Sequence, residues 1–225
     1  MDIDSVLNEA FGIYGRFFGR LVLIAGGVFL VLNLATALLG GVGGVAAGLA
    51  SAFISLVGTF WLQAALVEAT VDLRDGRADV PVPELFRQAR PFLVPGIVAG
   101  ILAALGIVAG LVLLIVPGLY LLTMWAVLIP VIVLESVPVG TAFSRSRELV
   151  RGNGWQVFGV LLILVLAVAV GTAIVSGLFA LVFPDFVGRW LGSTVANAVA
   201  VPFFAVAVTV MYLRLAGRGP EPQGA

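Results

Sequence analysis

The sequence predicts an all-α integral membrane protein with six transmembrane helices in three parallel repeats, each preceded by a cytoplasmic amphipathic interface helix. Composition is the first reason: 61% of the 225 residues are hydrophobic, 11% are charged, and the mean hydropathy is +1.19. Soluble domains are far less apolar. Six segments with almost no charge are the second reason, because about 20 apolar residues span the hydrocarbon layer of a bilayer. The third reason is a short pattern that recurs before each pair of these segments.

The recurring pattern is centred on Phe11, Phe86 and Phe143. Positions four and one before and three after each phenylalanine are Leu7/Ala10/Tyr14, Val82/Leu85/Ala89 and Val139/Ala142/Ser146, and only Ser146 is polar. This spacing is typical of a helix with one apolar face. It predicts repeats of about residues 1–76, 77–136 and 137–217 in one polytopic membrane domain, 1–217. Residues 218–225 are expected to form a short disordered tail.

The six expected spans follow in order along the chain. They are residues 21–39, 45–67, 92–116, 118–134, 156–183 and 191–213. The expected reversals within the pairs are Gly40–Gly44, Val116–Gly118 and Pro184–Arg189, which contain the Gly and Pro residues that tight turns favour. Pro130 is expected to kink the fourth span or interrupt its hydrogen bonding.

Two further patterns inside the spans concern helix packing. Small residues four apart allow helix backbones to approach closely, and such pairs occur at Gly44/Gly48, Gly96/Gly100 and Gly106/Gly110. The few polar residues in the spans are expected to form hydrogen bonds between helices. They are Asn33, Gln63, Thr123, Thr172, Ser176 and Asn197.

The arginines predict the orientation. All 12 basic residues are arginine, and all except Arg189 lie before the first span, between spans two and three, between four and five, or after six. The positive-inside rule therefore places both termini and the three short helices in the cytoplasm of a multi-pass plasma-membrane protein. Asp2, Asp4 and Glu9 make the first twenty residues unlike a signal peptide. The first span is thus expected to be an uncleaved anchor.

Composition also bears on chemistry. The chain has no Cys and no His, and its net charge is zero. The commonest metal ligand and general base are therefore missing, and no metal-spacing or phosphate-cradling motif replaces them. We expect no enzyme activity, no metal, no cofactor and no nucleic-acid partner.

Two carboxylates are candidate functional groups. Glu68 and Glu135 end the second and fourth spans at equivalent places in their repeats. They are either gating groups that bind a proton or cation near the cytoplasmic mouth, or structural groups, with Glu135 favouring the start of the next helix. The structural interpretation is preferred, because both lie within about one helical turn of the expected interface.

Three arginines are candidate lipid ligands. Arg145, Arg147 and Arg151 lie on the third short helix, and Gly152 and Asn153 are expected to end it. An interfacial helix holds its cations near the headgroups, and guanidinium groups bind phosphate in paired hydrogen bonds. The alternative is a solvated face without a specific ligand.

The segment from Pro117 to Gly159 resembles a known family. It contains Pro117-Gly118, then Trp125, Pro130 and Glu135, then the run Ala142–Trp155 and finally Val157-Phe158-Gly159. This is similar to the membrane domain associated with glycerophosphoryl diester phosphodiesterases and to related six-span bacterial proteins. The resemblance implies a multi-span membrane fold. In that family the phosphodiesterase activity belongs to a separate catalytic domain, so it is not expected of these residues.

The sequence thus predicts a non-enzymatic membrane protein that organises lipid or a protein partner at the cytoplasmic face. Its expected partners are membrane lipids, with a membrane-protein partner or a homo-oligomer as further options. The alternative is a transporter or permease component for a small molecule or lipid.

Overall fold

The computed structural model describes residues 2–74, 76, 78–183 and 186–217, apart from the side chains of 186–189. The described residues form helices and turns without a strand, which confirms the predicted all-α class. The helices are α1 (Ile3–Arg16), α2 (Phe18–Val42), α3 (Gly44–Arg74), α4 (Val82–Ala89), η1 (Arg90–Phe92), α5 (Leu93–Leu113), α6 (Ile115–Met124), α7 (Leu128–Glu135), α8 (Val139–Val150), α9 (Gly154–Val182) and α10 (Phe186–Leu215). Among the described residues, six segments are long and apolar enough to cross a membrane, as predicted. The tail at 218–225 lies outside the described residues.

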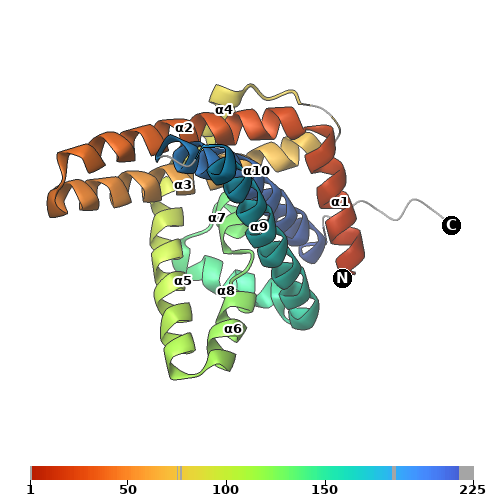
Figure 1. The fold of residues 1–225 in the computed structure, drawn as a ribbon. Coiled ribbons are helices and arrows are strands. Elements are labelled where there is room, and N and C mark those ends of the chain that lie inside the picture. The colour runs from red at the N-terminus through yellow and green to blue at the C-terminus, as the bar shows by residue number, and fades with distance from the viewer. Residues whose placement is uncertain (1, 75, 77, 184–185, 218–225) are drawn as a thin grey trace.

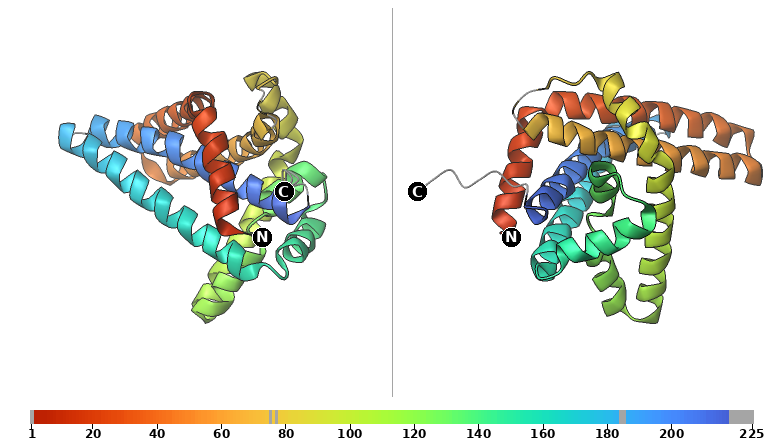
Figure 2. Two further views of the ribbon diagram at one scale, coloured as in Figure 1. Left: turned by 90° about the vertical axis from the view of Figure 1, so that its right-hand side faces the viewer. Right: turned by 180° about the vertical axis from the view of Figure 1, so that it is seen from behind.

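The long helices form three hairpins that diverge from a common base. In Figure 1 the α2–α3 hairpin extends to the left and the α5–α6 hairpin extends downward. The left view of Figure 2 shows the tip of the α9–α10 hairpin pointing in a third direction. Apolar side chains near the tips are open to the surroundings; Val42, Val112 and Leu181 are each about 80% exposed. Such surfaces are suited to contact with lipid rather than water.

The base of the hairpins, which we call the hub, is where the buried side chains gather. α10 is its central element and packs against α1, α2, α3 and α9. The second half of α3, the whole of α7 and the second half of α10 supply many of the fully buried side chains. The Tyr14 hydroxyl of α1 donates to the Val199 carbonyl oxygen at 2.8 Å. Burial raises the pKa of Tyr14 to about 12, so the phenol remains a donor at neutral pH.

The three short helices α1, α4 and α8 occupy the predicted positions. The side chains one residue before and three residues after each central phenylalanine are buried in all three helices. They are Ala10 and Tyr14, Leu85 and Ala89, and Ala142 and Ser146. Phe11 itself is 58% exposed, although it contacts Phe203. These buried faces pack on the hub. Contact of the same helices with a membrane interface, the repeat relationship and the domain limits stay predictions.

The expected reversal at Val116–Gly118 was wrong. The chain turns instead at Leu114, whose backbone is extended between α5 and α6. Pro117 lies in the first turn of α6, where a missing N–H costs no hydrogen bond. Gly118 packs on α5 so closely that a Cβ atom there would overlap Leu111. The Pro-Gly pair therefore permits a tight helix contact rather than the turn itself.

The expected interruption of the fourth span is confirmed. α6 ends at Met124 and α7 begins at Leu128, two residues before Pro130. Proline has no N–H to donate to the carbonyl four residues earlier, so the helix between these points loses regular hydrogen bonding. In the interrupted segment Ala126 N donates to Thr123 O, and Leu128 N donates to Trp125 O.

The packing predictions were met at some positions and not at others. A Cβ on Gly110 would lie 2.9 Å from the Gly118 Cα, so the backbones of α5 and α6 approach closely there, whereas Gly100 and Gly106 leave room for the rings of Phe60 and Trp125. A Cβ on Gly44 or Gly48, in contrast, would meet no neighbouring helix within 4 Å among the described residues, so the prediction for this pair was wrong. The gap arises because the tip of the α2–α3 hairpin stands apart from the other hairpins (Figure 1).

The expected hydrogen bonds between helices are found for one of two polar span residues and not for the other. The Asn33 amide of α2 donates to the Thr194 hydroxyl of α10 at 2.7 Å, which confirms an interhelical bond. The Thr123 hydroxyl donates to Leu119 O in its own helix at 2.8 Å, so the expectation was wrong there.

Candidate functional site

A groove of about 1450 Å³ lies between α6, α8 and the beginning of α9. Its walls are mainly apolar and aromatic, with Tyr120, Trp125, Phe143, Trp155 and Phe158 among the lining residues. Trp155 is 84% exposed. A tryptophan with this exposure is suited to the headgroup region, where its ring contacts apolar chains and its N–H contacts water.

Two contacts hold α8 against the interrupted span and so form the groove. The Phe143 ring meets the Trp125 ring edge-on, with centroids 4.9 Å apart. The Ser146 hydroxyl donates to the Met124 carbonyl oxygen at 2.9 Å. That carbonyl is available because Leu128 N donates to Trp125 O instead of continuing the α-helical pattern. Ser146, the one polar residue in the apolar stripe, therefore provides a hydrogen bond to the Met124 carbonyl, which the helix break leaves without its usual backbone donor.

Arg147 and Arg151 lie along the polar side of the groove. Arg147 is on the last turn of α8, and Arg151 caps the helix four residues later, with its backbone N–H donating to the Arg147 carbonyl oxygen at 3.0 Å. Both residues are exposed. α8 ends at Val150 and Gly152 has φ +91°, as expected for a glycine that ends a helix. Arg151 thus follows the last helical residue of α8 and is one of the residues that line the groove.

Arg145 has a different environment from the other two arginines. Its Nε donates to both carboxylate oxygens of Glu135, at 3.1 and 3.2 Å, and its Nη1 donates to Glu148 at 3.0 Å. Hydrogen bonds to Glu148 and then Glu135 raise the pKa of Arg145. Its guanidinium is engaged within the protein, and it is not among the groove-lining residues. Of the three arginines predicted to bind a lipid headgroup, Arg147 and Arg151 therefore stay candidates.

The structure separates the roles of the two candidate carboxylates. Glu135 ends α7, as predicted, but it pairs with Arg145 on the second turn of α8 and accepts a hydrogen bond from the Tyr212 hydroxyl at 3.0 Å. Glu68 is half-buried inside α3, which continues to Arg74, so the helix extends beyond residue 67, the predicted end of the second span. Glu68 is outside the ion-pair group that holds Glu135.

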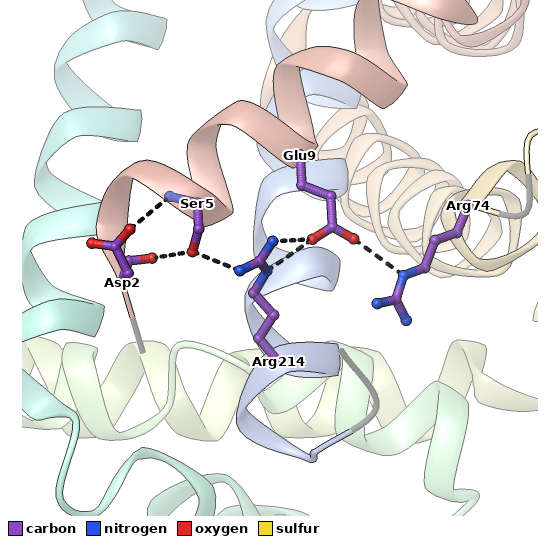
Figure 3. Close-up of polar contacts among 5 residues, drawn as sticks. All are labelled: Asp2, Ser5, Glu9, Arg74 and Arg214. Atoms are coloured by element: carbon purple, nitrogen blue, oxygen red, sulfur yellow. Dashed lines mark hydrogen bonds and ion pairs between the residues drawn. The ribbon is translucent and has the colours of Figure 1, made fainter. Parts of the chain in front are cut away.

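A second polar cluster joins α1, α3 and α10, and the sequence did not predict it. Glu9 accepts from Arg74 Nε at 3.1 Å and from Arg214 Nε at 2.8 Å (Figure 3). Arg214 also donates to the Ser5 hydroxyl, which donates to the Asp2 carbonyl oxygen. The available signal was a glutamate on the first short helix and an arginine at the end of each of two spans. The positive-inside rule uses such arginines for orientation alone and does not indicate their partners.

The comparisons with known proteins concern the half of the chain that contains the groove. Residues 96–216, just over half of the chain, match the family described as the membrane domain of glycerophosphoryl diester phosphodiesterase. This range includes all of α6 to α10. Neither a curated protein nor a solved structure gives a significant match. In the described part of the chain, no three acidic side chains gather as a metal site would require.

Proposed function

Because the chain belongs to the family of the membrane domain of glycerophosphoryl diester phosphodiesterase, we propose that it is a multi-pass membrane protein that organises phospholipid at the cytoplasmic face without catalysing a reaction. The observation that carries this proposal is the pairing of Arg147 and Arg151 with an aromatic groove. Two guanidinium groups that line one groove are suited to a lipid phosphate. The aromatic walls are suited to its apolar chains.

The proposed position of the protein in the membrane rests on its charges and on its exposed apolar side chains. The exposed apolar side chains on all three hairpins favour insertion in lipid. Four arginines of the hub, Arg20, Arg74, Arg145 and Arg214, form ion pairs between helices, and the positive-inside rule favours a cytoplasmic position for this part of the chain in the plasma membrane. On this proposal the lipid approaches the groove from the inner leaflet.

The lipid proposal predicts a loss of retained phospholipid when both groove arginines are changed. We expect Arg147→Gln with Arg151→Gln to retain less phospholipid than the parent, because each cation contributes about 1 kcal/mol near a charged leaflet. Native mass spectrometry of protein released from mixed-lipid micelles measures the bound lipid. The control is Arg16→Gln with Arg90→Gln, which removes two exposed arginines outside the groove lining. Equal retention by the groove variant and the parent would refute the proposal.

The non-enzymatic part of the proposal has its own test. The chain offers no histidine or cysteine as base, nucleophile or ligand. We expect the purified protein to leave glycerophosphocholine and glycerophosphoethanolamine intact, with or without added magnesium, calcium or zinc. Release of free alcohol is measured after purification to homogeneity. Turnover that is lost when Glu68 or Glu135 is changed to Gln would assign the activity to this chain and contradict the proposal.

A further inference from the structure

The groove contains a carboxylate as well as its two arginines. Glu148 lies next to Arg147 in the sequence and three residues before Arg151, and all three line the groove. The Glu148 side chain is 71% exposed. A site for phosphate alone gains nothing from a neighbouring negative charge, because like charges repel across a few ångströms.

The charge on Glu148 is only partly compensated by Arg145. Arg145 Nε makes two hydrogen bonds to Glu135, whose side chain is 16% exposed, and Nη1 makes one to Glu148 Oε2. One guanidinium is thus shared by two carboxylates, and the more buried one has the two-oxygen contact. The groove therefore presents an exposed carboxylate beside two exposed guanidinium groups.

We infer that the groove selects a glycerophospholipid whose headgroup carries a primary ammonium, the ethanolamine class. This inference rests on the proposed phospholipid-organising function. The lipid phosphate accepts hydrogen bonds from Arg147 and Arg151, and the headgroup ammonium donates to Glu148. The apolar chains lie against the aromatic walls, among them Tyr120 and Trp155.

The arrangement distinguishes this headgroup from two others with the same phosphate. A glycerol headgroup has no cation for Glu148, so its lipid keeps only the contacts with the arginines. A choline headgroup has a cation but no N–H, so it forms no hydrogen bond with the carboxylate. An exposed ion pair corresponds to about a two- to fivefold preference.

The test is a competition between lipids with identical acyl chains. Parent protein and variants are held in micelles that contain equal amounts of phosphatidylethanolamine, phosphatidylglycerol and phosphatidylcholine, and the bound species are counted by native mass spectrometry. We expect the parent to prefer phosphatidylethanolamine by about two- to fivefold and Glu148→Gln to lose that preference. Gln keeps the length of the side chain, and circular dichroism verifies the helix content.

A matched control is available on α4. Glu84 forms an ion pair with Arg87 three residues away, as Glu148 does with Arg145, but it lies outside the groove lining. Glu84→Gln is expected to keep the parent's lipid ratio.

The possible outcomes distinguish failure of this inference from failure of the proposed function. An unchanged ethanolamine-to-glycerol ratio in Glu148→Gln overturns the inference, and so does stronger binding of phosphatidylcholine than of phosphatidylethanolamine. In either case a drop in total phospholipid for the double arginine variant still supports the proposed function. If that variant retains as much total lipid as the parent, the proposed function fails and the inference fails with it.

Discussion

At the scale of single residues, Arg145 and Glu135 form a connection between three elements. Arg145 belongs to α8 and Glu135 ends α7, while Tyr212 of α10 donates to the same carboxylate. Both ion-pair partners are partly shielded, with side chains 35% and 16% exposed. A double-mutant cycle on Arg145→Ala and Glu135→Ala is expected to give a coupling free energy of about 0.5–3 kcal/mol. Reversible unfolding in detergent measures it.

The comparison for this cycle is the Arg87–Glu84 pair on α4, whose arginine is 77% exposed. Exposed pairs contribute about 0–1 kcal/mol, because water screens them. A coupling energy for Arg145–Glu135 no larger than that of the α4 pair would show that the contact does not stabilise the hub. The two cycles use the same residue types, but the α4 pair lies within one helix, whereas the Arg145–Glu135 pair joins α8 to α7 and is more buried.

At the scale of elements, the break between α6 and α7 determines where α8 lies. Pro130 removes one hydrogen bond from the span, and the rearranged turn leaves the Met124 carbonyl to accept from Ser146. Trp125, which follows α6, also meets Phe143 of α8 and covers Gly106 of α5. One interruption therefore positions the helix that carries Arg147 and Arg151. In a continuous helix the Met124 carbonyl would accept from the backbone N–H four residues later, and it would not be available to Ser146.

At the scale of the whole molecule, the chain consists of one packed hub and three diverging apolar hairpins (Figures 1 and 2). The hub is held by α10 and by the Glu9 cluster (Figure 3), which ties the first short helix to the ends of α3 and α10. The ion-paired residues Arg20, Arg74, Arg145 and Arg214 lie at the hub, and apolar side chains are exposed near the tips. This distribution underlies the proposed orientation, with the hub on the cytoplasmic side and the hairpins in lipid.

The orientation predicts the side from which single cysteines react. The chain has no native cysteine, so each introduced thiol reports one position. Ala78→Cys and Ser144→Cys are expected to react with an impermeant maleimide only from the cytoplasm, and Val42→Cys only from outside. All three positions are exposed. Labelling of Ser144→Cys and Val42→Cys from the same side would contradict both the orientation and the six-span topology.

The resemblance of residues 117–159 already indicated the family of the second half. The helical class, the six apolar segments and the interruption near Pro130 were also predicted correctly. These features depend on the length of apolar runs, on helical periodicity and on one missing N–H, all of which are local properties. The turn at Leu114 was misplaced because Pro117 and Gly118 favour a reversal and a helix start equally well. Local pattern alone does not separate these two uses.

Helix packing, in contrast, determines which arginines line the groove and which one forms ion pairs within the protein. Arg145, Arg147 and Arg151 are alike in sequence, but Arg145 meets Glu135 because α7 and α8 fold together. The same holds for Ser146, whose polar side chain is explained only by the Met124 carbonyl 22 residues earlier. It holds too for Glu9, which meets Arg74 and Arg214 from distant parts of the chain. Such contacts depend on how helices pack, and that packing is set by the combined burial of many side chains rather than by the residues at the site.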